Sequence, residues 1–315
     1  MAILEAPSRR KVEVTTSPRS PQTPQWLQYL RLTRTYTWVD AISTGLLGYF
    51  VMRPTGEAWK GLTVAVLSSL VLWFGLNWIS EFRQRDVGRI RVPFWMAALP
   101  LVAALGFVSA RNLIAIVPLV AYWLVSIVYA QKRAAPAIAD VCFVIRGIQT
   151  ALHFIFVAML FGPFQLSLLP LAGGLLLIQS SRSLVAEVRD EPFDEFGLPK
   201  LMQRVFGERS SKVTLAVAAA LGQAGGAVLG YVPLGIGVAF TLISVAIVRR
   251  YRVSTAIASF HIHRNFISVM VLIKCLSGPP AAHLLMAFTM TVVSYIIAGF
   301  EYSKVYRPIN ALAST

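Results

Sequence analysis

The chain has 315 residues, of which 56% are hydrophobic and 14% are charged. Soluble domains carry nearer a quarter of charged residues, so the composition excludes an ordinary soluble protein and predicts an all-helical bundle that crosses the membrane many times. The net charge is +15, but the basic residues lie in short clusters between apolar runs. That pattern is typical of loops flanking membrane helices, and no nucleic-acid partner is expected.

Two cysteines, Cys142 and Cys275, stand alone inside apolar runs. No second cysteine or histidine lies at the spacing of a zinc site, so neither a disulfide nor structural zinc is expected. Residues 1–25 are rich in Ser, Pro, Thr and Arg and lack the apolar core of a signal peptide. We expect them to form a disordered cytoplasmic tail, followed by an amphipathic approach to the membrane at 26–34 and one transmembrane domain over 26–310.

Nine apolar runs approach the roughly twenty residues that one bilayer crossing needs. They are 36–52, 61–80, 93–109, 112–130, 141–162, 165–181, 212–231, 233–249 and 283–301. A tenth run at 254–277 contains His261, His263, Arg264 and Lys274, so nine and ten spans both stay open. Lys and Arg gather in the loops after the second, fourth, sixth and eighth spans, which predicts that these loops and the amino terminus are cytoplasmic.

Acidic residues are concentrated after the sixth span. Six of the fourteen acids in the chain lie between Glu187 and Glu208. If this segment is helical, Glu187, Asp190 and Asp194 project from roughly one face and offer hard oxygen ligands suited to magnesium. The alternative is a solvated loop whose acids offset the arginines and lysines around them.

These residues resemble motifs of the UbiA superfamily of intramembrane prenyltransferases. The family has a D-x-x-D-x-x-x-D motif after helix six, which Glu187, Asp190 and Asp194 resemble, followed here by Gly197-Leu198-Pro199. Its Y-x-x-x-K element after helix four is similar to the segment from Tyr129 through Lys132 to Arg133. The similarity extends over Pro136, Asp140, Arg146 and Gly147.

The first acidic motif of the family, N-D-x-x-D-x-x-x-D at the end of helix two, is altered here. Asn77 is retained and Glu81 stands for the middle acid, but Trp78 and Arg85 replace the other two. Asp86 follows one residue late, about 100° further around a helix. Arg85 could contact a phosphate directly through a charge-assisted hydrogen bond, whereas Asn77 could instead be a polar residue bonded between helices.

The resemblance implies magnesium-dependent transfer of a prenyl group from an allylic prenyl diphosphate to a lipophilic acceptor, with an aromatic compound favoured. The implied metal ligands are Asn77, Glu81, Glu187, Asp190 and Asp194. The implied diphosphate contacts are Arg85, Lys132, Arg133, Arg146 and Arg182. Tyr129 would orient the diphosphate or present its ring to a carbocation, or it is an interfacial aromatic at a helix end.

Two other functions stay open. A terpene cyclase of the same superfamily would use the same chemistry without an acceptor, and the altered first motif is compatible with that outcome. A non-catalytic membrane protein or transporter would use titratable residues at membrane depth, such as His153, as a polar pathway. Such scattered residues do not account for the acidic cluster at a cytoplasmic loop.

Overall fold

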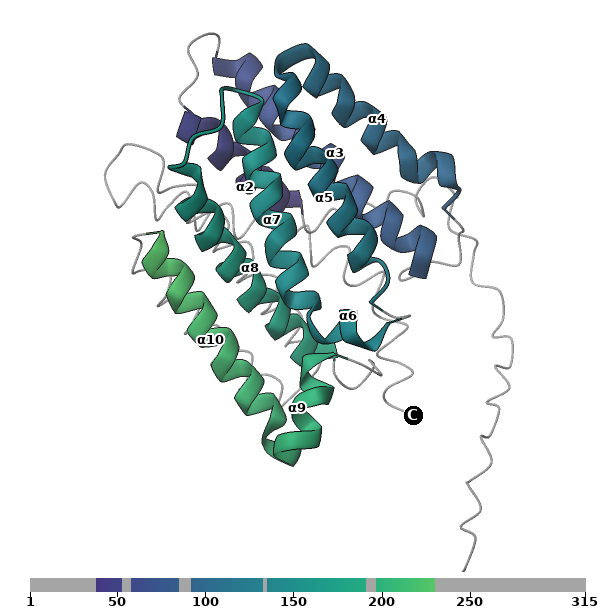
Figure 1. The fold of residues 1–315 in the computed structure, drawn as a ribbon, viewed down its shortest axis with the longest axis vertical. Coiled ribbons are helices and arrows are strands. Elements are labelled where there is room, and N and C mark those ends of the chain that lie inside the picture. Colours follow the sequence, from purple (N-terminus) through teal and green to yellow (C-terminus); the bar gives the residue numbers. More distant parts are fainter. Residues whose placement is uncertain (1–37, 53–57, 85–91, 133–134, 191–196, 230–315) are drawn as a thin grey trace, which may run out of the picture.

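The computed structural model describes residues 38–52, 58–84, 92–132, 135–190 and 197–229 (Figure 1). All regular structure in these ranges is helical, which confirms the predicted fold class. The helices are α2 (Trp38–Met52), α3 (Ala58–Gln84), α4 (Phe94–Arg111), α5 (Ile116–Tyr129), α6 (Pro136–Asp140), α7 (Cys142–Met159), α8 (Leu168–Asp190), α9 (Leu198–Phe206) and α10 (Ser210–Val228). Short 3-10 turns precede α5 at Leu113–Ala115 and α10 at Gly207–Arg209.

The seven predicted spans that fall in the described ranges correspond to α2, α3, α4, α5, α7, α8 and α10. Within the described residues, four helices are long and apolar enough to cross a membrane: Trp59–Ser80, Phe94–Arg111, Cys142–Met159 and Leu168–Val188. Three more, Asp40–Met52, Leu113–Tyr129 and Lys212–Val228, are apolar but shorter. The predicted tail at 1–25, the interfacial segment at 26–34 and the runs at 233–249, 254–277 and 283–301 lie outside the described residues.

Two helices continue beyond the predicted ends of their apolar runs. The run predicted to end at 181 continues as α8 to Asp190, and the run predicted to end at 80 continues as α3 to Gln84. Loss of hydrophobicity does not end a helix, and no glycine or proline interrupts either extension. Both acidic motifs therefore begin on helix.

The helices pack side by side, with α7 at the centre against α2, α5 and α8, while α10 packs on α8 (Figure 1). One buried apolar cluster lies among α7, α8 and α10 and includes Phe154, Leu168 and Ile178. A second lies among α3, α5 and α7 and includes Leu72 and Phe156. Because α7 contributes to both clusters, its polar residues lie between two apolar walls.

The outer faces of α4 and α5 are apolar. Exposed side chains on these helices are Phe94, Trp95, Leu99, Val102, Val117, Val120 and Leu124. Large apolar residues on the outside of a helical bundle match the hydrocarbon of a bilayer, with tryptophan favoured at its interface. The apolar spans and this surface together define an integral membrane protein.

Close contact between α7 and α8 depends on Gly147. A Cβ atom at this position would lie 2.6 Å from the Leu176 carbonyl oxygen and would clash with Ser180 Oγ. We expect Gly147→Ala to force the two helices apart and to destabilise the protein by about 1–3 kcal/mol. Unfolding in detergent, followed by circular dichroism against temperature, measures the effect.

Gly106 in the interior of α4 is the matched control, because a Cβ atom there would meet nothing within 4 Å. Gly106→Ala should be neutral or stabilise the helix by up to about 1 kcal/mol through helix propensity alone. Equal stability of the Gly147→Ala and Gly106→Ala variants would show that the α7–α8 contact is not tight.

Candidate functional site

The polar residues of α7 lie along one helical face. Arg146, Gln149, Thr150 and His153 follow the three- and four-residue spacing that places side chains on the same side of a helix. Gln149 and His153 are only 1% and 4% exposed. This polar face of α7 is directed into the bundle, where an unpaired polar group would be costly.

Arg146 is fixed by contacts from three helices. Its guanidinium carbon lies 5.1 Å from the ring centroid of Trp73 on α3 and 5.2 Å from that of Tyr129 on α5. Its Nη1 donates a 3.0 Å hydrogen bond to Gln149 Oε1, and Gln149 Nε2 donates one of 3.0 Å to Ser126 Oγ. The two rings and the amide hold the guanidinium in a defined position, since cation–π and hydrogen-bond contacts both restrict it.

Tyr129 also contacts a second cation, Lys132, next to Arg146. Lys132 Nζ lies 5.1 Å from the centroid of the Tyr129 ring and donates a 3.3 Å hydrogen bond to its hydroxyl. The structure thus gathers three of the predicted residues, Tyr129, Lys132 and Arg146. Lys132 and Arg146 both contact the Tyr129 ring. The ring is therefore better suited to positioning these two cations than to stabilising a carbocation.

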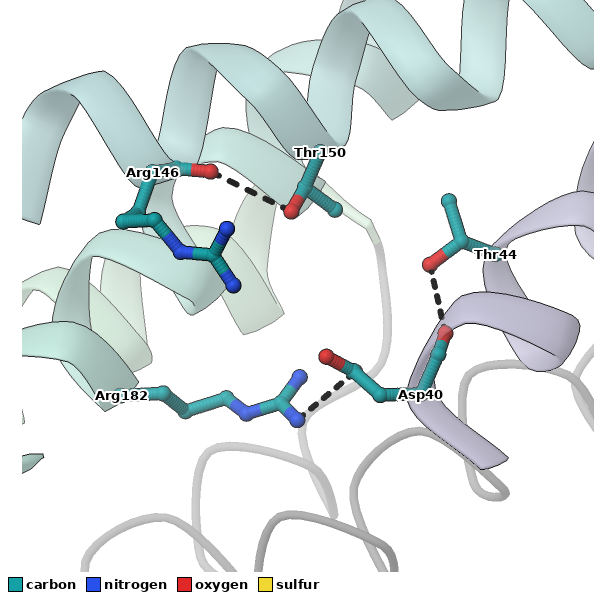
Figure 2. Close-up of polar contacts among 5 residues, drawn as sticks. All are labelled: Asp40, Thr44, Arg146, Thr150 and Arg182. Atoms are coloured by element: carbon teal, nitrogen blue, oxygen red, sulfur yellow. Dashed lines mark hydrogen bonds and ion pairs between the residues drawn. The ribbon is translucent and has the colours of Figure 1, made fainter. Parts of the chain in front are cut away.

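Arg182 on α8 forms a buried ion pair with Asp40 on α2 (Figure 2). Arg182 Nη2 lies 2.7 Å from Asp40 Oδ1, and the two residues are 5% and 6% exposed. The Thr44 hydroxyl donates a 3.0 Å hydrogen bond to the backbone oxygen of Asp40. No role was assigned to Asp40 from the sequence, although an acid at the fifth position of the predicted span 36–52 is costly without a partner and was a usable signal.

Glu187 lies near the carboxyl end of α8, which the loop charges predict to be cytoplasmic. It contacts the start of α7. The Cys142 thiol donates a 2.9 Å hydrogen bond to Glu187 Oε1. Gly197 lies beside this carboxylate, since a Cβ atom there would be 3.7 Å from Glu187 Oε2. Its φ of 117° favours glycine. Cys142 was assigned no role from the sequence, because a lone cysteine in an apolar run has no sequence signature.

Asn77 lies on α3 one helical turn after Trp73 and is 3% exposed. Among the described residues, its Nδ2 has no hydrogen-bond partner. The helix continues through Glu81, so Asn77 and Glu81 are one turn apart on the same face. Trp78, which stands where the family motif has an acid, stacks on Phe74 with ring centroids 6.1 Å apart. A buried amide with an open donor is suited to a polar ligand.

The other predicted residues lie beyond what the structure describes. Arg85, Arg133 and Asp194 fall outside the described ranges, and the side chains of Glu81 and Asp190 are likewise not described. Within the described residues, no three His, Cys, Asp or Glu side chains form a metal-sized cluster. Glu187 supplies one hard carboxylate of the kind magnesium prefers, and the full ligand set stays a prediction.

The polar groups share one end of the bundle. Trp73 just past the middle of α3 and Tyr129 at the carboxyl end of α5 contact Arg146 near the amino end of α7. Cys142 joins that end of α7 to Glu187 near the end of α8. Asp40 at the start of α2 joins the same region through Arg182. The described part of the site therefore combines the cations Lys132, Arg146 and Arg182 with the acids Asp40 and Glu187.

An apolar bundle with polar groups concentrated at one end is a polytopic membrane protein with a charged internal site. Its arrangement is similar to that of solved UbiA homologues. The apo structure of a UbiA homologue from Aeropyrum pernix K1 has a TM-score of 0.56 and 14% identity, covering 75% of this chain and 97% of that one. A UbiA homologue from Archaeoglobus fulgidus bound to Cd²⁺ has a TM-score of 0.52 and 14% identity, covering 86% and 99%.

No protein-family model and no curated protein matches the sequence. The likeness to the two solved structures nevertheless extends over nearly the whole of each. The chain has the UbiA fold, which confirms the predicted resemblance at the level of architecture.

The Asp40–Arg182 pair gives a prediction of stability. Arg182→Met should destabilise the protein by about 3–5 kcal/mol, because it leaves a buried carboxylate without its cation. The double variant Asp40→Leu/Arg182→Met should recover most of that loss, since apolar residues can replace a buried pair. Thermal unfolding of both variants in the same detergent measures the difference, and an equal or greater loss in the double variant would contradict this account.

Proposed function

We propose that this chain is a UbiA-type intramembrane prenyltransferase, which transfers a prenyl group from an allylic prenyl diphosphate to a lipophilic, aromatic acceptor. The observation that carries the proposal is the fixed Arg146 guanidinium between Trp73 and Tyr129, with Lys132 on the same tyrosine. Cations held in place at the polar end of an apolar bundle are suited to binding a diphosphate whose hydrocarbon tail lies in the bundle. The UbiA fold supports this assignment.

The chemical step needs positive charge at the leaving group. The allylic carbon–oxygen bond breaks heterolytically, and its electron pair leaves with the diphosphate. Arg146 and Lys132 would donate hydrogen bonds to the diphosphate oxygens, where negative charge grows in the transition state. Because Arg146 is already oriented by two rings and Gln149, little reorganisation is needed as that charge develops.

Glu187 fits a role as one metal ligand, with Asn77, Glu81, Asp190 and Asp194 proposed as the others. Magnesium, when bound, would further neutralise the charge on the diphosphate. The hydrogen bond from Cys142 orients Glu187 Oε1 toward the start of α7. Since α8 is helical through Asp190, Glu187 and Asp190 lie one turn apart on neighbouring positions of one face.

The apolar clusters on either side of α7 would protect the allylic cation from water. The acceptor's electron-rich carbon then attacks the cation, a carbon–carbon bond forms, and a proton leaves that carbon to restore aromaticity. Exclusion of water matters here, because hydrolysis would otherwise consume the cation. The isoprenoid tail would lie among the apolar residues of the bundle.

The test is to incubate purified protein with magnesium, allylic diphosphates of several chain lengths and a panel of aromatic acceptors. Diphosphate release and product mass are both measured. Release that requires an acceptor supports the transferase. Release with a cyclised hydrocarbon and no acceptor would replace the proposal with a terpene cyclase, and no release from any donor would contradict both.

Arg146→Gln should lower turnover roughly 100-fold or more, since it removes a fixed donor to the developing charge. Arg111→Gln is the matched control, because Arg111 also lies over an aromatic ring, that of Phe161, but at the end of α4 away from the site. Its activity should equal that of the wild type. Similar losses in both variants would remove Arg146 from the reaction.

The metal assignment is tested by isosteric amides. Asp190→Asn or Asp194→Asn should abolish turnover while leaving thermal unfolding unchanged, because the amide keeps the shape but loses the charge that binds magnesium. Glu81→Gln should reduce turnover more than Asp86→Asn, since Glu81 shares the face of Asn77 on α3. A larger loss of turnover in Asp86→Asn than in Glu81→Gln would show that Asp86, and not Glu81, is the metal ligand.

A further inference from the structure

The Asp40–Arg182 ion pair spans two helices that flank the polar face of α7. The main packing partners of α2 are α3 and α7, whereas α8 packs chiefly on α7 and α10. Figure 2 shows the Asp40 carboxylate approaching from α2 and the Arg182 guanidinium from α8, with the Arg146 guanidinium beside them on the side of α7. The Asp40 carboxylate therefore faces Arg182 across the interior.

Arg146 and Arg182 lie at similar depth. Cys142 and Glu187 are in contact and fix the register between α7 and α8. Arg146 is four residues further into α7, or about 6 Å along its axis, and Arg182 is five residues further into α8, or about 7.5 Å. Both arginines lie inward of Glu187 on neighbouring helices, so one anion bound beside Glu187 would be near both.

Charge balance gives Asp40 its importance. A guanidinium in the apolar interior is costly unless an anion pairs with it. The donor diphosphate supplies such an anion only while it is bound, so Arg182 needs another partner before the donor arrives and after the product leaves. Asp40 meets that need with a 2.7 Å contact. A diphosphate that reaches Arg182 must therefore compete with Asp40.

We propose that Asp40 is an internal counter-ion of Arg182 which competes with diphosphate for that guanidinium, and so weakens donor binding while it promotes release of product diphosphate. This proposal rests on the proposed function, which supplies the anion. Asp40 acts through Arg182 and is a positioning residue rather than a catalytic one. Its negative charge, not its shape, is the property that matters.

Binding of inorganic pyrophosphate in the presence of magnesium tests the proposal without turnover. Titration calorimetry on the purified full-length protein gives the dissociation constant. Asp40→Asn should bind pyrophosphate roughly tenfold more tightly than the wild type, the scale of coupling between close charges at a binding site. In steady state the same variant should have a lower KM for the donor and a lower kcat, because product release becomes slower.

Two variants separate this effect from a structural one. In an Arg182→Gln background, Asp40→Asn should lose most of its effect on pyrophosphate affinity, because the competition acts through Arg182. Ser181→Ala is the stability control: the Ser181 hydroxyl donates to the Ala218 backbone oxygen on α10, so its loss weakens a buried contact next to Arg182. Ser181→Ala should lower the unfolding temperature and leave pyrophosphate affinity unchanged.

Unchanged or weaker pyrophosphate binding by folded Asp40→Asn would overturn the counter-ion proposal while leaving the proposed function intact. Absence of magnesium-dependent pyrophosphate binding by the wild type would instead overturn the proposed function, and the counter-ion with it. If Asp40→Asn folds only when purified with pyrophosphate, the anion has replaced the lost carboxylate and the proposal is supported. If the variant stays unfolded even then, the proposal is wrong.

Discussion

Every charged group inside an apolar bundle needs a partner, and this requirement organises the protein. Arg146 is satisfied by two aromatic rings and an amide, Arg182 by Asp40, and Glu187 by the Cys142 thiol. Apart from the hydrogen bond between Arg146 and Gln149, which lie on the same helix, each of these contacts joins different helices. The polar end of the bundle is thus held together by the same side chains that we assign to chemistry, because desolvated charges are costly when they are separated.

The central helix α7 makes this arrangement possible. One side of α7 packs into the apolar cluster shared with α8 and α10, and another into the cluster shared with α3 and α5. The remaining polar face contacts α3 through Trp73 and α5 through Tyr129 and Ser126. Gly147 allows α8 to approach closely, which brings the start of α7 beside Glu187. Packing and placement of charge are therefore coupled through one helix.

Cations at this site are oriented by neutral groups as well as by acids. Trp73 and Tyr129 attract the Arg146 guanidinium without neutralising its charge, so the cation keeps its attraction for a phosphate. Asp40, in contrast, compensates the charge of Arg182 directly. The two arginines thus differ in how strongly an anion can engage them, although both lie at the same end of the bundle, with Arg182 buried and Arg146 half-buried.

Much of the architecture follows from hydropathy alone: the apolar runs predicted the seven spans in the described region, because a bilayer imposes length and composition on each crossing. The ends of α3 and α8 were underestimated, since helices persist where residues turn polar. Tyr129, Lys132 and Arg146 stood out in the sequence through their motif. Trp73 and Gln149 did not, because neither belongs to that motif. Asp40 belongs to no motif either, although an acid in an apolar span was a usable signal.

The sequence by itself determined the class of protein, the approximate spans and the residue types able to meet a diphosphate. Only the tertiary structure decided which charge pairs with which: that Arg182 contacts Asp40, more than a hundred positions away in the chain, and that Arg146 lies between rings from α3 and α5. Hydropathy depends on neighbours along the chain, whereas a desolvated charge is satisfied by whichever helix packs against it.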